Sequence, residues 1–193
     1  MQSSARNPLP GMMVVAALVL AVPALAPAGP VLAQEAVPLD DPVAYAESAG
    51  IPEIANEATI LDAEGNVLRE GANGWTCMAI PGAPMCVDEQ WMSWLDAYVN
   101  EGDEVEVTGV GLAYMLQGDD GASNLHPYDG EPNRDNEWVV TGPHIMLIVP
   151  DPALLASLPV DPRQGGPYVM WEGSHLVHVM IPVEEGTIHM PHH

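Results

Sequence analysis

Lysine is absent from this 193-residue chain, and arginine occurs only four times against 27 aspartate and glutamate residues. The formal net charge is −23 at pH 7. Affinity for nucleic acids depends largely on contacts between cationic side chains and phosphates, and anionic lipid headgroups attract basic segments in the same way. The scarcity of positive charge therefore argues against nucleic-acid and membrane-surface partners. Two explanations of the acidity remain. The acidic groups form a coat that keeps an exported protein soluble, or they attract cations or basic partners.

Phenylalanine is also absent, so the large apolar groups are tryptophan, tyrosine and the aliphatic side chains. Cysteine is scarce, and both copies, Cys77 and Cys86, lie in a segment rich in proline and glycine. Their spacing is neither C-x-x-C nor a zinc pattern. Disulfides are typical of exported proteins, so we expect one that closes the loop Met78–Met85.

No apolar run is long enough to span a bilayer comfortably, because the run Met12–Leu25 is interrupted by Pro23. Arg6 precedes the run, and Val31-Leu32-Ala33 offers small residues before Gln34. These features predict a secretory signal peptide over residues 1–33, a periplasmic or secreted protein, and no membrane insertion after its removal. Three arginines minus 27 acidic residues would give the mature chain a formal charge of −24.

About 160 mature residues suit one domain. We expect a flexible lead-in over residues 34–57, with a short helix beginning at Asp41-Pro42, then a globular domain over 58–183 and an acidic, His-rich tail over 184–193. A helix is predicted from the N-cap Asp88 to Val99, with tryptophan, leucine and tyrosine on its core-facing stripe.

Strands outnumber helices in the predicted pattern. A hairpin is expected between residues 58–61 and 67–69, and a second between 168–171 and 175–181. Further strands are predicted over 105–116 and 138–149, the latter interrupted at Gly142-Pro143, with a short helix over 152–158. This order favours an α+β fold with a mainly antiparallel sheet and one to two short helices, or a small barrel or sandwich.

Two short motifs carry the first functional hypothesis. His144-Ile145-Met146 and His178-Val179-Met180 are both H-x-M in apolar strand sequence. Residues i and i+2 share one face of a strand, so each motif presents an imidazole beside a thioether. If the strands are neighbours, two histidines and two methionines converge, a set suited to copper. The structural alternative is that the methionines pack in the core and that each histidine is a hydrogen-bonded core residue.

The segment 117–137 carries the second hypothesis, because long segments without periodicity are usually functional or disordered. It contains an alternating oxygen-rich run, Asp129, Glu131, Asn133, Asp135 and Glu137, that points to calcium, although Arg134 stands where an EF-hand has glycine. A hydrated acidic loop is the alternative. The segment also offers an acid–base set in which a histidine is the base: Asp119, Ser123, His126 and Asp129, with His144 expected nearby.

The H-x-M motifs resemble part of the motif of periplasmic copper chaperones of the cupredoxin-like kind, over His144–Leu147 and His178–Met180 only. The longer Met and His spacing of that family is not matched. Four further segments are similar to stretches of exported bacterial hypothetical proteins: 73–78, 114–119, 141–144 and 165–171. That resemblance implies one exported domain over about residues 58–183 and no mechanism.

The leading hypothesis is thus an exported copper-binding protein that uses His144, Met146, His178 and Met180. The first alternative is an exported, hydrolase-like enzyme with its active loop at 117–137. The second is a non-catalytic module that binds calcium or a protein. Copper binding requires the two histidines to share one metal position, whereas catalysis requires a histidine to meet a carboxylate or Ser123.

Overall fold

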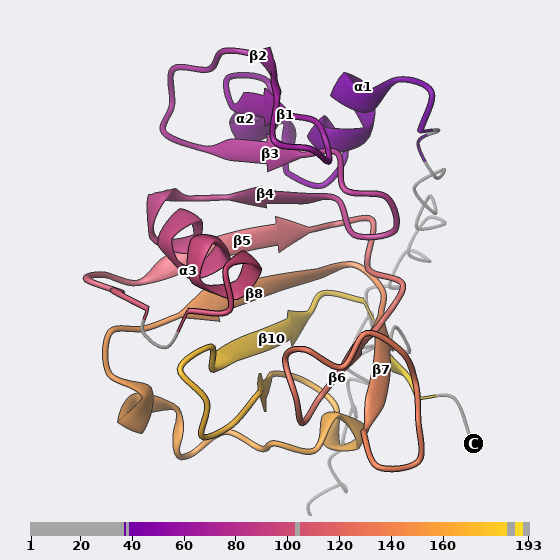
Figure 1. The fold of residues 1–193 in the computed structure, drawn as a ribbon, viewed down its shortest axis with the longest axis vertical. Coiled ribbons are helices and arrows are strands. Elements are labelled where there is room, and N and C mark those ends of the chain that lie inside the picture. Colours follow the sequence, from indigo (N-terminus) through magenta and orange to yellow (C-terminus); the bar gives the residue numbers. More distant parts are fainter. Residues whose placement is uncertain (1–36, 38, 103–104, 185–187, 191–193) are drawn as a thin grey trace, which may run out of the picture. The chain divides into compact units, whose positions relative to one another are not determined.

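Eight strands form the main sheet of the protein in a computed structural model that describes residues 37, 39–102, 105–184 and 188–190. Their order across the sheet is β2-β1-β3-β4-β5-β8-β10-β9 (Figure 1). The strands are β1 (Thr59–Leu61), β2 (Val67–Arg69), β3 (Thr76–Met78), β4 (Met85–Val87), β5 (Gly111–Met115), β8 (His144–Ile148), β9 (Tyr168–Met170) and β10 (His178–Pro182). Only β1 and β3 run parallel; the other neighbouring pairs are antiparallel.

A smaller sheet has the order β11-β7-β6. It consists of β6 (Ala122–Ser123), β7 (Trp138–Thr141) and β11 (Ile188–His189). The α+β prediction with a mainly antiparallel sheet is therefore confirmed. In the described part of the chain the main sheet ends at β2 and β9, so this order shows no closed barrel.

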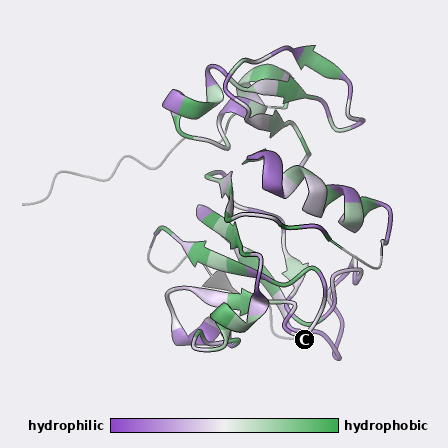
Figure 2. Ribbon diagram, turned by 90° about the vertical axis from the view of Figure 1, so that its left-hand side faces the viewer, coloured by the Kyte–Doolittle hydropathy of each residue, from purple (hydrophilic) through white to green (hydrophobic). Residues whose placement is uncertain are grey.

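The core lies between the sheet and α3 (Glu89–Val99). Asp88 caps this helix as predicted, because its carboxylate accepts the N–H of Trp91 at 3.1 Å. Trp91 and Trp94 are buried against β4, β5 and the strands beyond them. The strands are largely hydrophobic and the connecting loops largely hydrophilic, as Figure 2 shows. Burial alternates residue by residue along β5 and β8, so one face of each strand points into this core.

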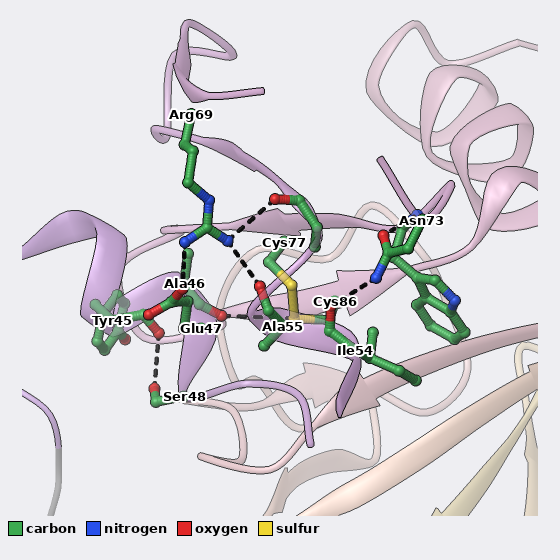
Figure 3. The surroundings of a disulfide bond; sticks show 12 residues. Tyr45, Ala46, Glu47, Ser48, Ile54, Ala55, Arg69, Asn73, Cys77 and Cys86 are labelled. Atoms are coloured by element: carbon green, nitrogen blue, oxygen red, sulfur yellow. Dashed lines mark hydrogen bonds and ion pairs between the residues drawn. A yellow bond between two sulfur atoms is a disulfide. The ribbon is translucent and has the colours of Figure 1, made fainter. Parts of the chain in front are cut away.

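Helices α1 (Pro42–Glu47) and α2 (Pro52–Ala55) cover the β1–β4 end of the sheet. The predicted disulfide between Cys77 and Cys86 lies beneath them and joins β3 to β4. The Arg69 guanidinium pairs with Glu47 and donates to the carbonyl oxygens of Ala55 and Ala58 at 2.7 and 3.1 Å (Figure 3). The short helix expected to begin at Asp41-Pro42 is α1, whereas α2, in the same segment that we expect to be a lead-in, was not predicted.

Three predicted elements are shorter than expected. The strand predicted over 105–116 is ordered as β5 only from Gly111, because the backbone N–H groups of Thr108 and Gly109 bond to the Gln90 side chain instead of a strand. The helix predicted over 152–158 is a 3-10 turn, η1 (Pro152–Leu155), and a second 3-10 turn, η2 (Pro162–Gln164), follows. The second hairpin pairs β9 with β10, and residues 171–177 form its turn.

The predicted signal peptide and most of the predicted tail lie outside the described residues. Within the described residues, no helix is long and apolar enough to cross a membrane.

Candidate functional site

The two H-x-M motifs lie on neighbouring antiparallel strands, β8 and β10. Met146 pairs directly with Met180, so their side chains share the core face of the sheet. His144, however, pairs with Pro182, four residues along β10 from His178. Four residues of strand span roughly 13 Å. The register therefore separates the backbones of the two histidines and gives each imidazole its own surroundings.

His178 is enclosed by aromatic rings. Its ring centroid lies 5.7 Å from Trp91, 5.3 Å from Trp94 and 4.9 Å from Trp171, each in an edge-to-face arrangement. Its Nδ1 lies 3.0 Å from the Leu176 carbonyl oxygen. Burial lowers its pKa to about 4, so the imidazole is neutral at pH 7. These contacts are those of a histidine that is packed and oriented within the core.

His144 has a different environment. Its side chain is fully buried at the start of β8, and Nδ1 lies 2.7 Å from the carbonyl oxygen of Gly142. A carbonyl oxygen only accepts, so Nδ1 carries the proton and Nε2 presents its lone pair. Nε2 has no hydrogen-bond partner among the residues that the structure describes, and it lies 3.8 Å from Oδ2 of Asp119. Burial lowers the pKa of His144 to about 4.

Asp119 is positioned by the backbone of β7. Its N–H donates to the Thr141 carbonyl at 2.8 Å, and its Oδ1 accepts the Thr141 N–H at 3.1 Å. The preceding Gly118 has φ of +76°, and a Cβ there would lie 2.7 Å from the Thr141 oxygen. This glycine therefore permits the close approach that directs the other carboxylate oxygen toward His144.

Burial also sets the charge of Asp119. Its side chain is 13 % exposed, and desolvation raises its pKa to about 6, against the opposing hydrogen bonds from Thr141 and Gly121. Tyr168 lies close by, with its hydroxyl 3.5 Å from Thr141 Oγ1, and burial raises its pKa to about 12. At pH 7.5 the site therefore holds an anionic carboxylate, a neutral imidazole and a neutral phenol.

Methionine side chains share the face of the sheet that carries His144. Met115 on β5 pairs directly with His144, and Met146 follows it two residues along β8. Both thioethers are buried in the same core cluster as Met180. Met115 is not among the ligands predicted from the sequence, although Tyr114-Met115-Leu116 preceding Asp119 was the available signal. Asp119 is predicted as part of the acid–base set and not as a metal ligand.

The predicted acid–base set is only partly assembled. Asp119 meets His144, but Ser123 Oγ accepts the backbone N–H groups of Leu125 and His126 instead of contacting an imidazole. The Asp129 carboxylate accepts Asn136 Nδ2 at 3.2 Å. His126 is exposed at the surface of the loop. Of the five candidates, the structure thus brings together only Asp119 and His144.

The alternating acidic run does not converge on one point. Asn133 Oδ1 accepts the N–H groups of Asp135 and Asn136, which forms a local turn. Across the described ranges, no three or more His, Cys, Asp and Glu side chains are grouped to hold a metal ion. A metal at His144 and Asp119 would therefore need other donors, such as the two thioethers.

Comparison of the chain with sequence models of known protein families, with curated proteins and with solved structures found no match. We therefore infer the function from the geometry of this site.

Proposed function

We propose that the protein is an exported copper-binding protein whose site is centred on His144 Nε2 and Asp119 Oδ2, with Met115 and Met146 as thioether donors. The observation that carries this proposal is that His144 Nε2, buried and without a hydrogen-bond partner among the described residues, lies 3.8 Å from Oδ2 of the mostly buried Asp119 carboxylate. A buried polar atom without a partner costs roughly 1–3 kcal/mol, and an ion is one of the ways in which such an atom is satisfied.

The spacing favours an ion over a shared proton. Hydrogen bonds between nitrogen and oxygen span roughly 2.7–3.2 Å, which is shorter than the observed separation. Metal–nitrogen and metal–oxygen bonds of roughly 2.0–2.2 Å each allow one ion to reach both atoms at 3.8 Å with a bent geometry. The neutral Nδ1–H tautomer of His144 is also the form that ligates through Nε2.

Charge supports the same conclusion. A carboxylate is costly to bury without a cation. Asp119 is mostly buried, and its only ion-pair partner among the described residues is His144, which the lowered pKa keeps neutral. A bound cation would supply the missing positive charge. Two thioethers on the same face favour Cu(I), while imidazole and carboxylate also accept Cu(II).

This proposal differs from the sequence hypothesis in its ligands. His178 and Met180 are removed from the primary set, because the register separates His178 from His144 and the tryptophan rings surround its imidazole. Met180 remains adjacent as a packing neighbour of Met146. The H-x-M motif of β8 is thus assigned to the metal, and that of β10 to the core.

The test is a competition titration of residues 34–193 with Cu(I) and Cu(II), with His189, His192 and His193 changed to asparagine so that the tail cannot bind. We expect one equivalent to bind, with loss of at least tenfold in affinity in H144A and D119N. The matched control H175A removes an exposed histidine and should bind as the parent does. Unchanged affinity in H144A would contradict the proposal.

A second function, acid–base catalysis by the same pair, is favoured by one observation. Burial moves the pKa of Asp119 up to about 6 and that of His144 down to about 4, and such divergence is typical of catalytic pairs. Catalysis predicts that metal-free protein hydrolyses members of an ester and amide panel and that D119N abolishes this. Copper binding without any such turnover would favour the first proposal.

A further inference from the structure

A second polar site lies away from the His144–Asp119 pair. A cavity of about 230 Å³ opens between the loop after β6, η2 and β9. Its walls combine a short apolar surface with carboxylates and one amide: Asn124, Leu125, Glu137, Val160, Asp161, Val169 and Glu172. None of these residues belongs to the proposed copper site, so the two sites can be tested separately.

Hydrogen bonds hold Asn124 in the wall of this cavity. Its backbone N–H donates to the Glu137 carbonyl at 2.8 Å, and its own carbonyl accepts the Trp171 N–H at 3.2 Å. Its side-chain Nδ2 donates to the Val160 carbonyl at 3.0 Å and to Glu137 Oε2 at 3.3 Å. Both of those partners are acceptors, so the amide cannot be reversed without placing oxygen against oxygen.

The amide oxygen is left without a partner. Asn124 is only 4 % exposed, and its buried Oδ1 makes no hydrogen bond within the described part of the chain. A buried acceptor of this kind is costly unless a donor reaches it. Asn124 lines the cavity, so the cavity is where a bound donor for this oxygen is sought.

The carboxylates around the cavity carry more negative charge than the neighbouring arginine balances. Arg163 donates to Asp161 at 2.8 Å and lies 3.5 Å from Glu137, with its guanidinium largely exposed. Glu172 has no ion-pair or hydrogen-bond partner among the described residues. Three carboxylates and one guanidinium thus leave an excess of two negative charges around a partly enclosed volume.

We propose that this cavity binds a compact organic cation, an alkylammonium or guanidinium group with a short apolar part. Its N–H donors would reach Asn124 Oδ1 and the Glu172 carboxylate, and its apolar part would lie against Leu125, Val160 and Val169. The cavity offers acceptors and carboxylates, which are complementary to donors of positive charge. Arg163 already pairs with carboxylates that line this cavity, so the chemistry suits a guanidinium.

An inorganic ion fits this cavity less well. Among the described residues, its three carboxylates do not form a group that could hold a metal ion. Calcium takes six to eight oxygen ligands at roughly 2.3–2.6 Å, which demands closer convergence. An organic cation instead spreads its donors over several ångströms.

The test is a titration of ¹⁵N-labelled residues 34–193 with n-propylammonium or methylguanidinium chloride at constant ionic strength, followed by ¹H–¹⁵N NMR. We expect saturable shifts of the Asn124 side-chain amide and of Trp171 Nε1, which donates to the adjacent Ser123 carbonyl at 2.6 Å. The uncharged isostere n-propanol should not produce them at the same concentrations.

Variants separate this site from general attraction to an acidic surface. E172Q should weaken binding roughly tenfold, since it removes a charged acceptor. R163Q should tighten it, because the competing guanidinium is lost. E106Q, in a remote cavity lined by α3 and the loop after it, is the matched control and should have no effect. Equal binding in E172Q, shifts scattered over all acidic loops, or tighter binding of Ca²⁺ than of either organic cation would overturn the proposal.

Discussion

Among single residues, His144 and Asp119 form the centre of the proposed copper site. The Nδ1–H···O=C bond to Gly142 fixes the tautomer, so Nε2 and the Asp119 carboxylate meet as two acceptors. A proton on Asp119 or a bound cation would relieve this contact. The pKa of about 6 for Asp119 means that the carboxylate is charged at pH 7.5, which is the form that binds a cation.

Substitution D119N tests the electrostatic part of this account in metal-free protein. Asparagine keeps an oxygen for the Thr141 N–H and places a donor toward His144 Nε2 while removing the buried charge. We expect the free energy of unfolding of D119N to be about 2–3 kcal/mol larger than that of the parent at pH 7.5, so the variant is more stable. Urea denaturation with a chelator present measures this difference.

The pH dependence has a definite sign. Burial raises the folded-state pKa of Asp119 from 3.8 to about 6. The protonated Asp119 carboxyl therefore contributes its full share to the free energy of unfolding below pH 3.8, and this contribution is lost as the pH rises through 6. The difference between D119N and the parent should therefore grow between pH 4 and 6 and then level off. A D119N protein that is less stable than the parent at pH 7.5 would contradict this account.

At the scale of elements, local signals predicted much of the fold. Asp88 gave the start of α3, Asp62–Asn66 gave the turn between β1 and β2, and Gly142-Pro143 marked the break between β7 and β8. The pairing of β8 with both β5 and β10 was not predictable, because register depends on long-range packing and not on local sequence. That pairing is what puts Met115 beside His144 and separates His144 from His178.

Gly118 is the element-scale position on which the site depends. With φ at +76° and the Thr141 oxygen 2.7 Å from where a Cβ would stand, G118A must move the turn that carries Asp119. We expect G118A to reduce stability by about 1–3 kcal/mol and to weaken copper binding at least tenfold. G130A is the matched control, because a Cβ at Gly130 meets no atom within 4 Å. Equal copper affinity in G118A and G130A would show that the turn does not position the ligand.

For the molecule as a whole, the large negative net charge is the main electrostatic feature. The chain has a formal charge of −23, and few arginines relieve it. Such self-repulsion destabilises the folded state and is screened by salt. We expect the midpoint of thermal unfolding to rise steadily between 10 and 300 mM NaCl at pH 7.5, measured by circular dichroism. A midpoint that is independent of salt over this range would mean that the acidic groups do not interact appreciably.

Composition could predict an acidic, disulfide-bonded α+β protein, but it could not predict where buried charge lies. Asp119 is one acid among 27, and only the three-dimensional structure distinguishes its buried carboxylate from the hydrated ones. The same holds for Asn124, whose unpartnered oxygen follows from contacts with Glu137, Val160 and Trp171 that lie far apart in the sequence.

X-ray absorption spectroscopy of residues 34–193 with one equivalent of Cu(I), in the background without tail histidines, tests the proposed copper site. We expect a nitrogen or oxygen shell at roughly 2.0 Å and a sulfur shell at roughly 2.3 Å. The sulfur shell should diminish in M115L or M146L, and the first shell should change in H144A. A spectrum without sulfur, or one identical in H144A, would contradict a copper site built on His144, Asp119 and the neighbouring methionines.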